Sequence, residues 1–159
     1  MIAPRGRRRG VRARALNGVM ALILGRLGVP VPRVWMLRVH GRRTGRLRSV
    51  PVLVLRRGRD RFLVAPHGET DWTRNLRAAG WGELWRRRAT HRVSADELLG
   101  EDRTLVVEAY ARRYRWLTGR FFDLPRRFSR DDVRRIAGGH PAFRLRPADG
   151  APGPSAPGT

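Results

Sequence analysis

The sequence predicts an α+β fold, a mostly antiparallel β-barrel with helices packed on its outside. Two observations lead to this class. Segments rich in apolar and β-branched residues are separated by short turns that contain glycine. Between them lie two segments whose apolar residues recur at helical spacing. The chain of 159 residues can bury one core but hardly two. The expected order of elements is βββ-α-ββ-α-β.

Three strands come first, and we expect them to form a meander. They are residues 34–39, 47–55 and 62–65. Two polar turns, at residues 41–45 and 57–60, connect them, and the first turn contains two glycines. Pro51 interrupts the long second strand, because proline has no N–H to donate to a neighbouring strand. It therefore indicates a bulge or an unpaired donor there.

A helix over residues 71–79 follows, with Trp72, Leu76 and Ala79 on one face. Thr70 or Asp71 is its expected cap, and Gly80 is its expected stop.

The rest of the barrel consists of a hairpin, a helix and a last strand. Residues 81–87 and 89–93 alternate as a hairpin does, and residues 142–145 form the last strand. A helix that begins near Glu101 is expected between them, with its apolar side chains at helical spacing. These side chains are Val106, Tyr110, Tyr114 and Leu117.

The two ends of the chain are expected to lie outside the barrel domain, which we place at residues 32–146. Residues 1–31 form a basic arm with an amphipathic helix over about 11–27, which either packs on the barrel or lies on an anionic membrane surface. Its apolar stretch, residues 19–24, is too short to cross a membrane, so we expect a cytoplasmic protein. Residues 147–159 are rich in proline and glycine and are expected to be disordered.

The net charge of +22 results from 35 basic and 13 acidic side chains, which is the composition of many nucleic-acid-binding proteins. All 35 basic residues are arginine, however, and they are spread over strands, turns and helices. This spread favours a solvated arginine-rich surface over a specific nucleic-acid partner. Cysteine is absent, and the four histidines lack metal-ligand spacing. Redox chemistry would therefore need an organic cofactor, and no metal site is expected.

Two segments are candidates for chemistry. In the turn from Gly41 to Arg48, four arginines and Thr44 surround a flexible backbone, which suits an oxyanion, although a solvated turn has the same composition. In residues 64–77 a strand ends, a loop turns at a glycine and a helix begins, which suits a phosphate or a polar ring edge. Trp72 could equally be a core residue, and Asn75 a cap.

Together these segments resemble the deazaflavin-dependent nitroreductase family of actinobacteria. The resemblance rests on Gly41-Arg42-Arg43-Thr44-Gly45, on Pro51 in the next strand, and on Trp72-Thr73-Arg74-Asn75-Leu76-Arg77. It implies a split β-barrel of the kind that binds flavin mononucleotide (FMN), with coenzyme F-420 as the cofactor and FMN as the less favoured alternative. It also implies hydride transfer to a small oxidised acceptor such as a quinone, a nitroaromatic or an unsaturated compound.

The resemblance also implies which residues border the cofactor. They are Arg42, Arg43, Thr44, Arg48, Ser49, Val50, Pro51, Val64, Ala65, Pro66, His67, Gly68, Asp71, Trp72, Thr73, Arg74 and Asn75. Among these, Arg43, Arg48 and His67 would meet the phosphate-bearing tail. Relatives often have lysine in place of His67, and histidine holds its charge only part of the time near neutral pH.

Tyr110 and Tyr114 are the candidate catalytic residues, as proton donors to the reduced acceptor. Solvent is the alternative donor, and packing of an amphipathic helix is the alternative role for both tyrosines. The segment from residue 121 to 136 differs from the tyrosine-rich segment of relatives, so acceptor specificity is not carried over. Two other functions remain open, a barrel that binds FMN, haem or deazaflavin without turnover and a basic nucleic-acid-binding module. A homodimer is also open.

Overall fold

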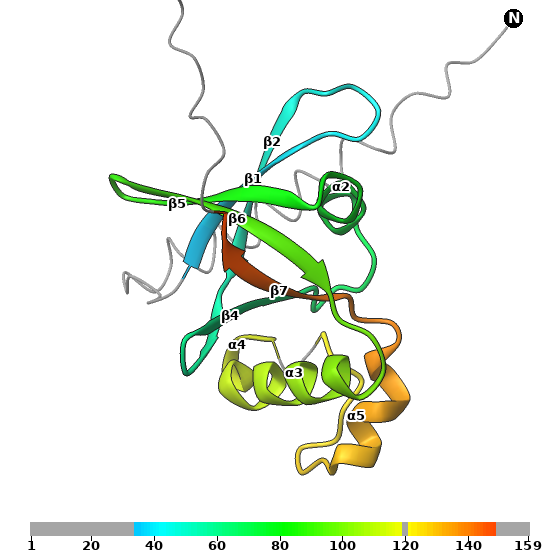
Figure 1. Cartoon of the computed structure of the whole chain (residues 1–159). Coiled ribbons are helices and arrows are strands. Elements are labelled where there is room, and N and C mark those ends of the chain that lie inside the picture. Colours follow the sequence, from blue (N-terminus) through cyan, green and yellow to red (C-terminus); the bar gives the residue numbers. More distant parts are fainter. Residues whose placement is uncertain (1–33, 119–120, 149–159) are drawn as a thin grey trace, which may run out of the picture.

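A computed structural model describes residues 34–118 and 121–148. The expected N-terminal helix lies outside these residues, as do residues 149–159 of the expected disordered tail, whereas Pro147, the first residue of that tail, belongs to the last strand. Seven strands form the sheet (Figure 1): β1 (Val34–His40), β2 (Leu47–Leu53), β3 (Leu55–Arg57), β4 (Asp60–Val64), β5 (Trp81–Arg86), β6 (Ala89–Glu97) and β7 (Ala142–Pro147). The helices are α2 (Asp71–Ala79), α3 (Gly100–Arg113), α4 (Arg115–Thr118) and α5 (Arg130–Ala137).

The strands form one antiparallel sheet in the order β2-β1-β5-β6-β7-β4-β3. β2 and β3 lie at opposite edges of this sheet, yet a single residue, Val54, separates them in the chain. Consecutive Cα atoms are about 3.8 Å apart, so the two edges must meet at Val54 and the sheet must curl. This confirms the expected α+β fold, a mostly antiparallel split barrel with helices outside it.

The structure corrects one sequence prediction about the first strands and narrows another. The expected long strand over residues 47–55 is divided at Val54 into β2, which pairs with β1, and β3, which pairs with β4, so each half has only one of the two neighbours that the expected meander gives it. The run of strand-forming residues could not show this, because the change of partner at Val54 depends on distant strands. Pro51 causes no bulge, since it stands opposite Met36 in an unbroken register. β2 is an edge strand, where a missing N–H is tolerated.

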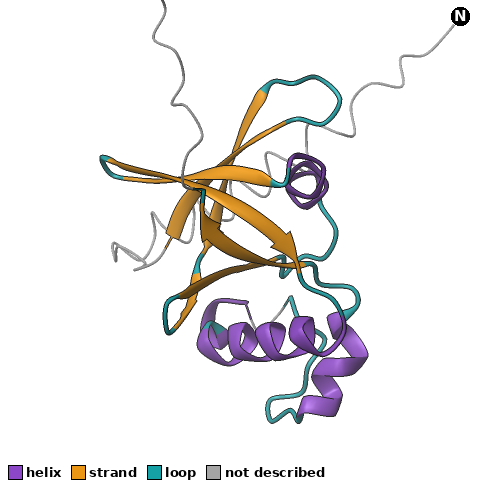
Figure 2. Cartoon of the chain, viewed as in Figure 1, coloured by secondary structure: helices purple, strands orange, loops and turns teal. Residues whose placement is uncertain are grey.

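The buried side chains form two clusters on the two faces of the sheet. The inner cluster fills the barrel and includes Leu37, Leu63 and Phe143, each 0 % exposed. The outer cluster lies between β3, β4 and β7 and the helices α3 and α5. Figure 2 shows these two helices together on one side of the sheet, with α2 apart from them. Helix α2 contributes Leu76 to the inner cluster instead.

Helix boundaries follow local signals. The predicted helix over residues 71–79 is confirmed, with Thr70 at its N-cap and Gly80 in the left-handed conformation (φ 71°) at its end. The predicted second helix is confirmed as α3, followed by the short α4. The sequence interpretation missed α5, although Ser129 and Asp132 cap it reciprocally, with the Asp132 N–H 3.2 Å from Ser129 Oγ.

Candidate cofactor site

The turn from Gly41 to Arg48 is closed by its own backbone. The Gly45 N–H donates to the Gly41 carbonyl, and the Gly41 N–H donates to the Arg46 carbonyl, both at 2.8 Å. Gly45 has φ +65°, which side chains disfavour. A Cβ on Gly41 would lie 3.1 Å from Thr44 Oγ1. Gly45 therefore suits the left-handed position of the turn, and a side chain at Gly41 would crowd Thr44 and Arg46.

Helix α2 holds this turn through Asn75. The Asn75 side-chain oxygen accepts the Arg42 backbone N–H at 3.1 Å and the Arg42 Nη1 at 2.9 Å. Arg42 Nη1 also lies 3.4 Å from an Asp71 carboxylate oxygen. Asn75 is only 5 % exposed, so its amide is a buried link between two segments 33 residues apart. The fold thus brings the two predicted segments into direct contact.

Three further arginines of the turn are exposed. Within residues 34–118 and 121–148, Arg43, Arg46 and Arg48 have no side-chain hydrogen bond or ion pair. Arg42, in contrast, is bound to α2. The turn therefore presents three unpaired guanidinium groups beside a helix N-terminus, an arrangement suited to phosphate oxygens.

Alternation along β2 divides the predicted residues between two faces. Arg48 and Val50 stand opposite Val39 and Leu37 of the inner cluster, whereas Ser49 and Pro51 point to the outer face. Helix α2 packs on the inner side. A ligand held between the turn and α2 would therefore meet Arg48 and Val50 rather than Ser49 and Pro51.

The first turn of α2 also divides into inward and outward side chains. Thr73 is 0 % exposed. Its hydroxyl accepts the Thr70 N–H at 3.0 Å and lies 2.7 Å from Glu69 Oε1. Asp71 and Arg74 face solvent. Trp72 is partly buried beside Phe143, which favours the core role that the sequence had left open.

An ion-pair network fixes the end of the loop before α2. Arg77 donates two hydrogen bonds to Glu69, each 3.1 Å long, and also binds Glu97 on β6. The hydrogen bonds from Arg77, and then the one from Thr73, lower the pKa of the Glu69 carboxyl. Arg77, the last residue of the motif, therefore supports the site by joining Glu69 of the loop to Glu97 of β6. Its position after Leu76 in the sequence did not indicate this role.

At the end of β4 the backbone is already used within the protein. The Ala65 N–H donates to the Pro141 carbonyl at 2.9 Å, and the Ala65 carbonyl accepts the Gly68 N–H at 3.1 Å. His140 Nδ1 lies 3.0 Å from the same carbonyl. Val64 and Ala65 are both buried. Val64 and Ala65 therefore form part of the core beneath the site. His67 is exposed, and Pro66 and Gly68 are partly exposed.

The fold brings His67 and His140, which seemed scattered in the sequence, close together. The His67 ring lies 4.0 Å from the Phe121 ring between centroids. Partial burial, and then the charge of His140, lower the pKa of His67 below 6.5. His67 is therefore mostly neutral at pH 7. The sequence interpretation missed the contribution of Phe121 and His140, because no local signal links positions so far apart.

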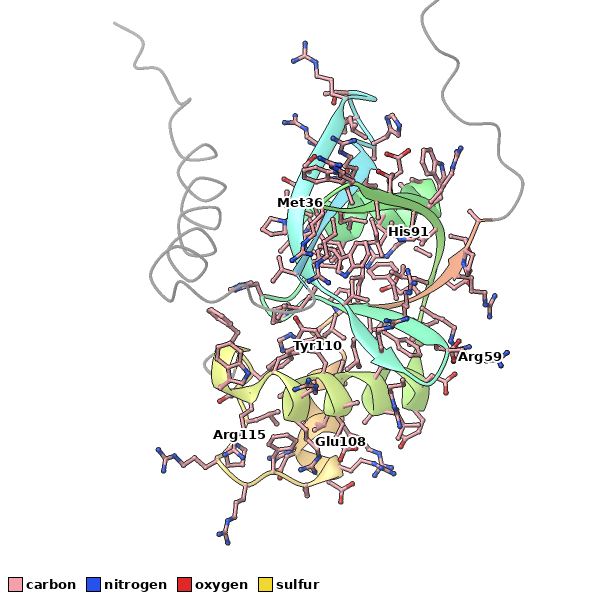
Figure 3. The ribbon with its side chains drawn as sticks, turned by 90° about the vertical axis from the view of Figure 1, so that its left-hand side faces the viewer. Met36, Arg59, His91, Glu108, Tyr110 and Arg115 are labelled. Atoms are coloured by element: carbon pink, nitrogen blue, oxygen red, sulfur yellow. The ribbon has the colours of Figure 1, made fainter. Side chains whose placement is uncertain are left out.

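Tyr110 and Tyr114, the candidate proton donors, lie in the outer cluster. They are 2 % and 3 % exposed, and their rings are 4.9 Å apart. Burial raises the pKa of Tyr110, and Tyr114 donates to the Val54 carbonyl at 3.0 Å. In Figure 3, Tyr110 lies between α3 and the barrel. This placement favours the packing role that the helical spacing had left open.

Comparisons with known proteins agree with this picture. A family model described as F-420H(2)-dependent quinone reductase matches residues 9–120. No curated protein matches the sequence. A solved F-420-H2-dependent reductase is 18 % identical, with a TM-score of 0.53 over 72 % of this chain and 95 % of its own.

Two other solved structures share the fold. A chain solved as a domain-swapped dimer is 17 % identical, with a TM-score of 0.53 over 85 % of this chain and 99 % of its own. A conserved hypothetical protein of Mycobacterium tuberculosis is 13 % identical, with a TM-score of 0.52 over 81 % and 87 %. Identities this low show the fold alone.

The curled antiparallel sheet with the basic turn held by α2 is a split barrel, and the family match makes the protein an oxidoreductase. More specifically, the chain belongs to the F-420H2-dependent quinone reductase family, whose model covers more than half of it. The family cofactor is coenzyme F-420, and the match gives no support to FMN. No helix among the described residues is long and apolar enough to span a bilayer.

Proposed function

We propose that the protein binds coenzyme F-420 between the Gly41–Arg48 turn and the start of α2, and transfers its hydride to a small oxidised acceptor. The acceptor classes are those the resemblance implies: a quinone, a nitroaromatic or an unsaturated compound. The observation that carries the proposal is the Asn75–Arg42 contact, because it joins the two motif segments into one surface.

The donors present on this surface fit the anionic tail of the cofactor. Arg43 and Arg48 would bind its phosphate, since guanidinium groups donate forked hydrogen bonds to oxyanions. Within the part of the chain that the structure describes, neither group is neutralised by a carboxylate. His67 would contribute shape and hydrogen bonding rather than charge at neutral pH, because its pKa is lowered.

The protein's own contribution to hydride transfer is to hold the cofactor and the acceptor in place. The bound deazaflavin supplies the hydride, so the chain needs no nucleophile. The backbone of residues 64–68 and the first turn of α2 would border the ring, with Thr73 and Asn75 fixing these segments from inside. We assign the proton for the reduced acceptor to solvent, because Tyr110 and Tyr114 are buried.

The test is a fluorescence titration of the purified protein with coenzyme F-420, with FMN as the comparison ligand. We expect saturable binding of F-420 at micromolar protein and much weaker binding of FMN. Reduced F-420 should then be oxidised on addition of a quinone or a nitroaromatic. Binding of F-420 without turnover of any acceptor class would instead support a non-catalytic barrel.

The same titration with duplex DNA at several salt concentrations tests the nucleic-acid alternative. Arginine spread over a surface gives weak binding that falls steeply with salt. If DNA binds while neither F-420 nor FMN does, the proposed function is wrong.

We also propose a cytoplasmic homodimer. One structural neighbour was solved as a domain-swapped dimer. Light scattering of the purified protein, with and without anionic vesicles, would measure its mass and any membrane association.

A further inference from the structure

A second region has the chemistry of a binding site, on the side of the sheet that α3 and α5 cover. A hollow of about 260 Å³ lies there between α3 and the loop of residues 121–129. It shares no residue with the Gly41–Arg48 turn or with α2. Arg115 lies beside this yellow loop in Figure 3.

The floor of the hollow is apolar and firmly packed. Ala111 and Phe122, which are 3 % and 4 % exposed, join it to the outer cluster. Leu124 and Phe128, both partly buried, continue the lining. A ligand could therefore bury an apolar body there without any rearrangement of the core.

The loop that forms one wall is held in place. Arg112 donates to the Phe128 carbonyl at 3.3 Å, and its guanidinium carbon lies 4.5 Å from the centre of the Phe128 ring. The Leu124 N–H donates to the Phe122 carbonyl at 2.8 Å. The Arg112 contacts attach the loop to α3, and the Leu124 bond fixes a turn within the loop.

Two arginines from different segments line the hollow, Arg115 in α4 and Arg126 in the loop. Within the described ranges, neither has a hydrogen bond or ion pair. The nearby carboxylate of Glu108 is already bound by Arg112 at 3.0 Å and Arg130 at 2.9 Å. Two positive groups beside an apolar floor favour a ligand with an anionic end and an apolar body.

We propose that this hollow binds a small amphipathic organic anion, an aromatic or branched carboxylate. Its apolar part would contact Phe122 and Leu124, and its carboxylate would bind Arg115 and Arg126. The hollow is open to solvent on one side, and its volume of about 260 Å³ suits a ligand with one ring or a short branched chain. The hollow shares no residue with the Gly41–Arg48 turn or with α2, although the ring of Phe122 in its floor lies 4.7 Å from the His140 ring between centroids.

The test uses phenylacetate as the anionic probe and 2-phenylethanol as its uncharged counterpart, both titrated into the full chain without cofactor. Ligand-observed NMR measures the dissociation constant. We expect saturable binding of phenylacetate only. Arg115→Gln and Arg126→Gln should each weaken it about tenfold, the effect of losing one charge-assisted hydrogen bond. Leu124→Ser should also weaken it, through loss of apolar contact.

Arg87→Gln is the matched control, because Arg87 is an exposed arginine in the turn between β5 and β6, and it should leave binding unchanged. Circular dichroism verifies that each variant is folded. Equal binding of 2-phenylethanol, wild-type affinity in both arginine variants, or an equal loss in Arg87→Gln would each overturn the proposal. So would displacement of phenylacetate by F-420, since the probe would then occupy the cofactor surface.

Discussion

Two arginine-rich hairpin tips of this protein differ in how they are supported. The tip between β1 and β2 is attached to α2 through Asn75 and Arg42. The tip between β5 and β6 carries Arg87 and Arg88, neither of which has a side-chain hydrogen bond or ion pair within the described residues. In Figure 1 the first tip rises beside α2, and the second projects away from the barrel. Arginine content alone therefore does not identify a site, whereas attachment to a second element does.

Removing charge from the two tips should have very different effects on cofactor binding. Arg43→Ala combined with Arg48→Ala should weaken F-420 binding about 100-fold, if each arginine supplies one charge-assisted hydrogen bond to phosphate. Arg87→Ala combined with Arg88→Ala removes the same charge and should change the affinity less than about twofold. Fluorescence titration at fixed salt measures both. Equal losses would mean that net charge, not the turn, attracts the cofactor.

Removing the link to α2 should cost stability as well as affinity. Asn75→Ala leaves the partly buried Arg42 N–H without its acceptor, so we expect a loss of about 1 kcal/mol in the free energy of unfolding. Urea denaturation monitored by circular dichroism measures this change. Asn75→Asp keeps an acceptor oxygen and should retain more of the stability. A wild-type unfolding midpoint in Asn75→Ala would contradict the role given to this contact.

Substitutions that change the backbone freedom of the two tips should change the unfolding free energy by no more than the loss expected for Asn75→Ala, and in opposite directions. Gly45 has φ +65° and Arg87 has φ +55°, a conformation that costs residues with a Cβ about 1–2 kcal/mol. Gly45→Ala should therefore lower the unfolding free energy by about 1 kcal/mol, and Arg87→Gly should raise it by up to about 1 kcal/mol. Thermal unfolding of the two variants gives both signs, and two changes of the same sign would refute this explanation.

The smallest effect concerns the pH dependence of stability near the proposed cofactor surface. The pKa of His67 is lowered in the folded protein by partial burial and by His140. The unfolded chain therefore takes up a proton first, and stability should fall as the pH drops below 6.5 toward the folded pKa. The carboxyl groups of Glu69 and Glu108 act only at lower pH, since their pKa values are lowered.

His67→Gln should therefore flatten the stability profile below pH 6.5. An unchanged slope in His67→Gln would show that this histidine does not titrate differently in the folded state.

The parts of the fold that depend on nearby residues could be predicted from the sequence. The hairpins, the caps of α2 at Thr70 and Gly80, and the buried face of α3 follow from neighbouring residues, and the structure confirms them. The change of strand partner at Val54 could not be predicted, because it depends on which distant strands lie beside each half of the segment. Helix α5 had a local signal, the Ser129 and Asp132 capping pair, which was not used.

The two segments of the candidate site could be predicted from the sequence, but the contacts between their residues could not. The resemblance located both segments, but the contact between Asn75 and Arg42 crosses 33 positions and needs the folded barrel. In the structure, Arg48 and Ser49 lie on opposite faces of β2 because side chains alternate along a strand. The resemblance, which implied a run of consecutive residues, did not distinguish the two faces. The ring contact between His67 and Phe121 likewise appears only in three dimensions.

The edge position of β2 has a further consequence, for solubility. An edge strand leaves backbone groups open to pairing with another chain, and charged side chains or proline commonly prevent this. β2 carries Arg48 and Pro51 along such an edge, and Arg46 directly precedes the strand. The arginines assigned here to phosphate recognition would also protect the barrel against strand-by-strand aggregation. Variants that lose them should therefore be kept dilute, since the same substitutions remove a ligand contact and expose an unprotected edge.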